Sequence, residues 1–212
     1  MTAPTTSPYT RAQLLEHARG ALKLRILYWL GAGASESGEP TDPSTPIDPK
    51  AALDEKRRHP EYADVVRQYD EAMRQLGLRF DDLPRRACDC SGFVAWALGV
   101  ARQQPLAGSE WMNTDSIHAD ATRGHSQFEV VTVAQPGDFL VYPSPGKPKP
   151  GHIGIVSEVD AAGRPLKVIH CAPDNFRIVQ PDGRRTAIAA TDLAIFEASP
   201  ATRIVAYKRF NA

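Results

Sequence analysis

The chain has 212 residues, a length that suits one domain or one domain with an insertion. Hydrophobic residues make up 42% of the chain, enough for a packed core, which argues against wholesale disorder. The 25 basic residues balance 25 acidic ones, so the basic excess typical of nucleic-acid-binding proteins is absent and we expect no nucleic-acid partner.

The number of cysteines and the length of the apolar stretches indicate where in the cell this protein is expected. The three cysteines, Cys88, Cys90 and Cys171, are too few and odd in number for a disulfide framework. No apolar stretch of signal-peptide length opens the sequence, and no run is long enough for a membrane span. We therefore expect a cytoplasmic location, with export by a non-Sec route left open. The oligomeric state does not follow from the sequence.

The first half of the chain has helical patterns. A capping box of Thr10 and Gln13 predicts a helix that starts at Arg11 and runs to about Gly31. Four prolines within residues 40–49 predict a loop. An amphipathic helix is expected next, ending near Gly77, with an apolar face of Tyr62, Val65, Val66, Tyr69, Met73 and Leu76.

The pattern changes from helical to extended at about Phe128. Five short, β-branched segments are separated by Pro and Gly turns: residues 128–134, 138–143, 152–159, 166–172 and 203–210. Because helices come first and strands follow, the sequence predicts an α+β protein with an antiparallel sheet of five to six strands.

Cys90 lies in the stretch "CDCSGFVAWALG", where a third helix is expected to start. A cysteine at this place can be a metal ligand, a core thiol or a nucleophile. Asp89 is a good N-cap, which places Cys90 in the first turn, where the helix N-terminus favours a thiolate and lowers the thiol pKa. Gly92 is expected to leave room for a substrate. The C-x-C spacing differs from the common C-x₂₋₄-C spacing of zinc sites, so we expect no metal.

Two of the six histidines are candidates for the base that a cysteine nucleophile needs. His152 and His170 each lie on an expected strand, and the short link between these strands predicts a hairpin. Both imidazoles share a face if the register pairs even positions with even ones, but the sequence leaves that register open. His152 is the expected base, and His170 the group that orients it.

The segments "DCSGFVAWALG", "QPGDFLVY", "GHIGIV" and "VIHCAP" resemble, in order and form, the NlpC family of papain-like cell-wall cysteine peptidases. The resemblance implies a papain-like fold with Cys90 as nucleophile, His152 as base and His170 as third member. It is looser for "YWLGAG", in which Tyr28 matches an upstream aromatic motif. The oxyanion is expected to be held by the Tyr28 hydroxyl and by backbone N–H groups at the helix start, from Cys90, Ser91 and Gly92.

The resemblance also implies the substrate, a peptidoglycan stem peptide or muropeptide cut after a D-glutamyl residue, with no cofactor. Alternatives are an amidase, deamidase or acyltransferase acting on another substrate, and an inactive binding module of the same fold. We expect residues 1–212 to form a single catalytic domain. Residues 34–86 are then an insertion between the Tyr28 motif and Cys90, because this gap is longer than is usual in the family.

Overall fold

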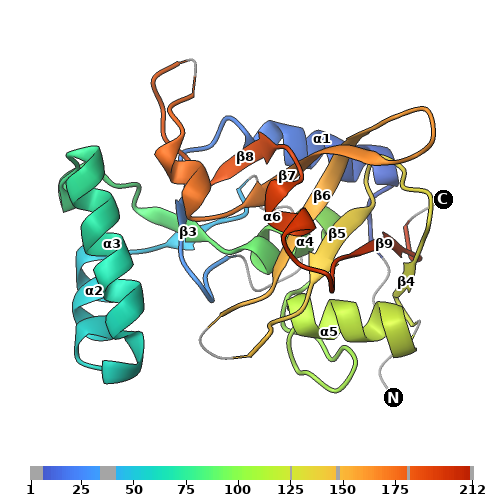
Figure 1. Ribbon diagram of the computed structural model, residues 1–212, viewed down its shortest axis with the longest axis horizontal. Helices are drawn as coiled ribbons and strands as arrows, with labels where there is room; N and C mark the ends of the chain where they lie inside the picture. Colours follow the sequence, from blue (N-terminus) through green and yellow to red (C-terminus); the bar gives the residue numbers. More distant parts are fainter. Residues whose placement is uncertain (1–6, 34–41, 125, 147–148, 181, 211–212) are drawn as a thin grey trace.

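A six-stranded antiparallel sheet with a buried helix against one face forms the body of the protein (Figure 1). The computed structural model describes residues 7–33, 42–124, 126–146, 149–180 and 182–210. The strand order is β4 (Phe128–Val130), β9 (Arg203–Tyr207), β5 (Phe139–Tyr142), β6 (His152–Val159), β7 (Pro165–Cys171) and β8 (Ile188–Thr191). With six α-helices in the described part of the chain, this confirms the expected α+β, papain-like class.

The two faces of the sheet follow from the alternation of side chains along its strands. Residues such as Val141, Ile153 and Ile169 point into the main core with helix α4 (Cys90–Leu98). The other face carries Val156 and Val168, which are covered by Phe196 from the short helix α6 (Ala194–Glu197). Both faces are therefore buried around the central strands, and α4 occupies the middle of the molecule.

Helix α4 has no polar face, because all nine of its residues are buried. Asp89 caps its N-terminus, and Gly99 ends it in the left-handed conformation with φ of 68°. Helix α1 (Arg11–Ala21) packs against α4 through its buried leucines and alanines. It begins at the expected capping box of Thr10 and Gln13.

The first helix ends at Ala21, so the expectation that it runs to Gly31 is wrong. Residues Leu27–Tyr28 form a strand instead, β1, which pairs in parallel with β3 (Arg86–Cys88). Strand β2 (Thr45–Pro46) pairs with β3 from the other side. The aromatic and branched side chains after the helix favour this pairing, which buries Leu27 and places Tyr28 opposite Cys88.

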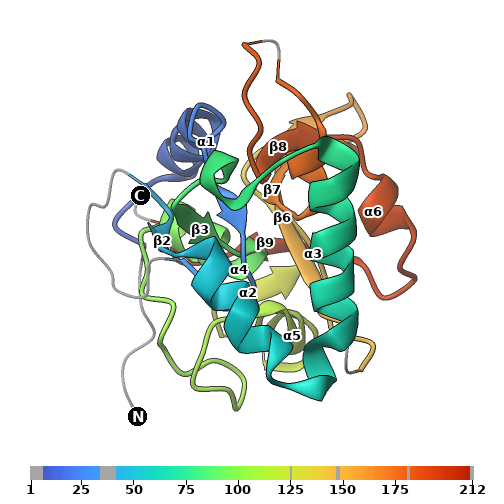
Figure 2. The same ribbon diagram turned by 90° about the vertical axis from the view of Figure 1, so that its left-hand side faces the viewer.

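Residues between β2 and β3 form a helical hairpin at one end of the molecule, at the left in Figure 1 and in front in Figure 2. Its helices are α2 (Pro49–Arg57) and α3 (Ala63–Leu76). Helix α2 starts inside the proline-rich stretch expected to be a loop, because Asp48 caps it and Pro49 occupies the first turn, where no N–H is required. Helix α3 ends at Gly77 as expected, but none of its residues is fully buried.

The remaining helical segments lie between these elements. They are helix α5 (Thr114–Ala119), the short π-helix Asp120–Gly124 and the 3₁₀ helices Pro60–Tyr62, Phe80–Asp82 and Asp174–Arg177. Across the described ranges, no helix combines the length and apolar character that a membrane crossing demands.

Candidate active site

Cys90 is the first residue of α4, and Asp89 holds the start of this helix in place. One carboxylate oxygen of Asp89 accepts a hydrogen bond of 2.8 Å from the Gly92 N–H, which is the N-cap bond. The other oxygen accepts from the Gly31 N–H at 2.8 Å. The turn that follows Tyr28 is therefore tied directly to the residue before the thiol.

Arg102 balances the charge of Asp89 beneath the helix start. Its guanidinium lies 2.5 Å from the Asp89 carboxylate, and both side chains are buried. A second guanidinium nitrogen donates to the Ala32 carbonyl at 2.8 Å, and the Ser91 hydroxyl donates to Asp89 at 3.1 Å. The Ser91 side chain is thus part of the hydrogen-bond network around Asp89. Sequence reasoning gave no role to Arg102, because nothing in its local pattern links it to a position 13 residues earlier.

Gly92 faces the protein interior. A β-carbon at this position would lie 2.9 Å from the Ala32 carbonyl oxygen and 3.2 Å from Arg102 Nη1. The expectation that Gly92 leaves room for a substrate is therefore wrong. The chain itself fills that room, and the glycine permits the close approach of the Ala32 backbone to α4.

His152 and His170 lie on the same face of the sheet. The β6–β7 ladder pairs Val156 with Val168, so even positions oppose even positions, which settles the register that the sequence left open. His152 Nε2 lies 2.7 Å from His170 Nδ1. The two imidazoles are therefore joined by a short hydrogen bond.

Phe196 and Gly154 shape the surroundings of this histidine pair. The Phe196 ring centroid lies 5.3 Å from that of His152 and 5.8 Å from that of His170. A β-carbon on Gly154 would lie 3.0 Å from both His170 Cβ and Phe196 Cζ. The glycine of the "HIGIV" segment is thus required because a histidine and a phenylalanine sit over it.

The thiol of Cys90 lies at the start of β6. The backbone N–H groups of Ile153 and Ser91 both hydrogen-bond its sulfur and work to lower its pKa. Ile153 directly follows His152, so the fold brings the thiol and the histidine pair to the same end of β6. Tyr142 pairs with His152 in the β5–β6 ladder, and the two rings lie tilted against each other with 6.1 Å between their centroids.

Burial dominates the proton equilibria of these groups. It raises the pKa of the Cys90 thiol to about 12, with the Asp89 carboxylate adding to the rise. It lowers the pKa of His152 to about 3 and that of His170 to about 4. The expectation that the helix N-terminus lowers the thiol pKa is therefore wrong, because desolvation outweighs it, and the resting site holds a neutral thiol and neutral imidazoles.

Tyr28 lies close to Cys90 and Asp89. Burial raises the pKa of Tyr28 well above its ordinary value, and the Asp89 carboxylate adds to the rise. Its hydroxyl therefore keeps its proton and stays a hydrogen-bond donor. The Tyr28 carbonyl accepts a 2.5 Å hydrogen bond from the Tyr69 hydroxyl, which attaches α3 to this part of the site.

Cys88 and Cys171 are buried, and all three cysteines are free. The Cys171 thiol lies 3.3 Å from the Cys88 carbonyl oxygen, in the core beneath α4. Thr191 is a neighbour of the site that sequence reasoning missed, because the alanine-rich β8 gave no strand signal. Its hydroxyl oxygen lies 2.9 Å from His170 Nε2.

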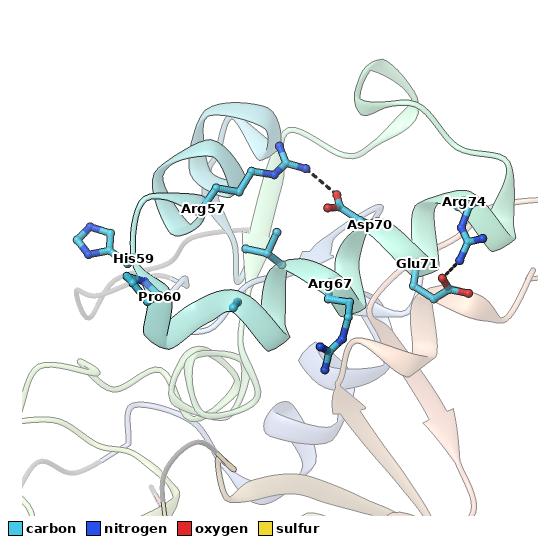
Figure 3. Close-up of a pocket in the computed structure, with 9 residues that line it drawn as sticks. Arg57, His59, Pro60, Arg67, Asp70, Glu71 and Arg74 are labelled. Carbon is cyan, nitrogen blue, oxygen red and sulfur yellow. Dashed lines mark hydrogen bonds and ion pairs between the residues drawn. The ribbon is translucent and has the colours of Figure 1, made fainter.

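A hollow of about 530 Å³ lies on the α2–α3 hairpin, away from Cys90 (Figure 3). Its basic side chains point at acidic ones, Arg57 at Asp70 and Arg74 at Glu71. None of the residues discussed above for the site lines it. The third arginine of the lining, Arg67, pairs with Asp64 beside the hollow. Each of these arginines therefore already has a carboxylate partner.

A buried thiol at a helix start and a histidine pair on an antiparallel sheet lie at the same end of β6 in this papain-like α+β fold. Residues 81–172 match the family model of the CHAP domain. CHAP domains belong to the NlpC/papain-like class of cysteine peptidases and amidases, which confirms the relationship expected from the motifs. A search of curated proteins found no match to the chain.

The matched segment includes Cys90, His152 and His170 and stops before Thr191, while Tyr28 precedes it. A CHAP domain implies hydrolase chemistry of the cysteine peptidase or amidase type, with peptidoglycan as the class of substrate.

Proposed function

We propose that this protein hydrolyses an amide bond of peptidoglycan stem peptides, as an endopeptidase that cuts between D-glutamate and the following diamino acid. In this proposal Cys90 is the nucleophile, His152 the general base and His170 the residue that orients His152. The observation that carries it is the 2.7 Å contact between His152 Nε2 and His170 Nδ1, at the end of β6 that meets the Cys90 thiol.

The neutral resting state favours attack coupled to proton transfer. The Cys90 sulfur forms a bond to the amide carbon while its proton passes to His152. His152 then gives the proton to the leaving amine as the C–N bond breaks, which leaves a thioester on Cys90. Water then attacks the thioester carbon while His152 accepts one of its protons. The C–S bond breaks, His152 returns the proton to the Cys90 sulfur, and the carboxylic acid product leaves.

The developing oxyanion needs donors that are already in place. The Cys90 backbone N–H at the helix start is one candidate, and the protonated Tyr28 hydroxyl is the second. The Ser91 hydroxyl is bonded to Asp89 and its backbone N–H to the Cys90 sulfur, so we assign Ser91 to support of the nucleophile instead of the oxyanion. We assign Gly92 to the positioning of the helix start instead of contact with the substrate.

The test is hydrolysis of purified muropeptides by the wild-type protein and by Cys90→Ala, with Cys88→Ala as the matched control. We expect the D-glutamyl bond to be cut by the wild type and Cys88→Ala, and no product from Cys90→Ala. Cleavage of a different amide bond would point to an amidase of other specificity. An inactive wild type on all muropeptides, with its fold intact by circular dichroism, would contradict the proposal.

We further propose that residues 1–212 act as one catalytic unit in which residues 34–86 are an insertion that narrows access to the site. The α2–α3 hairpin lies outside the matched segment and contacts the Tyr28 region through Tyr69, whose ring also packs on Trp29 at 5.3 Å. We expect short, freed stem peptides to be cut faster than intact sacculi. Equal release from sacculi would contradict this role of the hairpin.

A further inference from the structure

A continuous line of hydrogen bonds leads from the histidine pair to the backbone of the loop after β8. His152 Nε2 contacts His170 Nδ1 at 2.7 Å. His170 Nε2 contacts the Thr191 hydroxyl oxygen at 2.9 Å. That hydroxyl donates its proton to the Asp192 carbonyl at 2.9 Å. The line therefore ends at a group that can only accept.

This end point determines the position of every proton along the line. A threonine hydroxyl has one proton, and here the Asp192 carbonyl takes it, so Thr191 can only accept from His170. His170 must then carry its proton on Nε2 and leave Nδ1 free. Because His170 Nδ1 can only accept, His152 must carry its proton on Nε2.

The consequence for His152 is that its Nδ1 has a free lone pair. Both imidazoles are neutral at pH 7, because burial lowers their pKa values to about 3 and about 4. A neutral imidazole has one protonated nitrogen, and Nε2 is the protonated one in this arrangement. The unprotonated Nδ1 is then the atom that can take a proton from a thiol.

We propose that Thr191 is a positioning residue that fixes the tautomers of His170 and His152, so that His152 Nδ1 is held unprotonated as a base. This role rests on the proposed function of the histidine pair. The Asp192 carbonyl makes the hydroxyl an acceptor, and a hydroxyl without this bond could equally donate to His170 and reverse every proton along the line.

The sheet register explains why position 191 performs this role. In the β7–β8 ladder, His170 pairs with Ala189 and Val168 with Thr191. Thr191 is therefore on the same face as His170 and two residues further along β8 than Ala189, which is a diagonal contact within reach of a histidine ring. Ala189 directly opposite His170 leaves room for the ring to point toward Thr191.

The decisive measurement is ¹⁵N NMR of the histidine rings at pH 7, which distinguishes protonated from unprotonated ring nitrogens and needs no substrate. Signals are assigned with His152→Gln and His170→Gln. We expect both rings of the wild type to carry their proton on Nε2. In Thr191→Val, which cannot accept, we expect a mixture of tautomers, and in Thr191→Ser the wild-type pattern. A wild type with His152 protonated on Nδ1, or unchanged tautomers in Thr191→Val, would overturn the proposal.

Kinetics on muropeptides supply the second readout. We expect Thr191→Val to lower kcat by about 3- to 10-fold with KM unchanged, the factor that one hydrogen bond provides, and Thr191→Ser to restore it. Thr122→Val is the control, because Thr122 also donates to a carbonyl, that of His118, but contacts no site histidine. A Thr191→Val enzyme with wild-type kcat would overturn the proposal. If no muropeptide is cut, the proposed function fails, and the NMR result still decides on Thr191.

Discussion

The Asp89 carboxylate lies 2.5 Å from the Arg102 guanidinium, in a buried ion pair at the start of helix α4. Asp89 holds the Gly31 and Gly92 N–H groups, while Arg102 holds the Ala32 carbonyl. The pair therefore joins the segment after Tyr28 to α4, and through it the two halves of the site become one unit.

Replacing one partner of this ion pair should lower the free energy of unfolding by more than the loss of its hydrogen bonds alone would. We expect Asp89→Asn to lower the free energy of unfolding by about 3–5 kcal/mol, because Arg102 is left buried without a counter-charge. Urea unfolding measures this. The control is Asp54→Asn, which removes an exposed carboxylate paired with Lys50 and Arg57 and should change stability little. Equal effects of the two substitutions would contradict the assigned role of the buried pair.

Gly154→Ala tests the packing over the histidine pair. The added methyl group would press on His170 Cβ and Phe196 Cζ, each 3.0 Å away, so we expect a loss of about 1–3 kcal/mol in stability together with reduced hydrolysis. Gly20→Ala is the matched control, since nothing lies within 4 Å of its added carbon on α1. The free energy of unfolding of Gly20→Ala should rise by up to about 1 kcal/mol, because alanine has the higher helix propensity. A Gly154→Ala variant with wild-type stability and hydrolysis would contradict the assigned close packing, because it would mean that β6 can shift to accept the methyl group.

Alkylation reports the state of the Cys90 thiol. Because burial raises its pKa to about 12, we expect iodoacetamide to label Cys90 much more slowly at pH 7 than a free cysteine. The Cys90 residue is also only 4% exposed. Mass spectrometry of timed samples follows each cysteine, and the urea-unfolded chain gives the reference rate. Rapid and selective labelling of Cys90 at pH 6 would mean that a thiolate is present after all.

Acid should weaken the fold through the two buried histidines. In the unfolded chain both titrate near pH 6.5, whereas burial lowers their folded pKa values to about 3 and about 4. Between these limits the unfolded chain binds more protons, so stability is full above about pH 6.5 and falls as the pH drops toward 4.

The His170→Asn variant isolates this effect. Its absolute stability will differ, but one buried titrating group is gone, so the slope of unfolding free energy against pH between 6.5 and 4 should become shallower. Urea unfolding at several pH values gives the slope for both proteins. An unchanged slope would place the acid sensitivity elsewhere in the molecule.

The sequence predicted the parts of the site that have a local signal. Cys90 has an N-cap before it and an apolar helix after it, and His152 and His170 lie on strands with clear two-residue periodicity. The register between them came only with the structure, because it depends on the β6–β7 irregularity between Val156 and Val159 as well as on the turn.

Other features could not be read from local patterns because tertiary contacts decide them. Leu27 and Tyr28 follow a helix-forming run but become a strand, since β3 offers them a partner some sixty residues away. Thr191 lies on an alanine-rich segment that is a strand only because β7 lies beside it. The thiol pKa followed from the depth of burial, which a helix-start motif does not specify.

The sheet order also sets when this protein can fold. Strand β9 lies between β4 and β5 although it follows both by more than sixty residues, so these two strands are joined into one sheet only when β9 arrives. A ribosome-bound chain that stops before Arg203 presents β5 with an open edge to every neighbouring chain. Pairings of such long sequence separation form slowly. With this topology, the unpaired edge of β5 must therefore be kept from pairing with other chains until β9 has been synthesised.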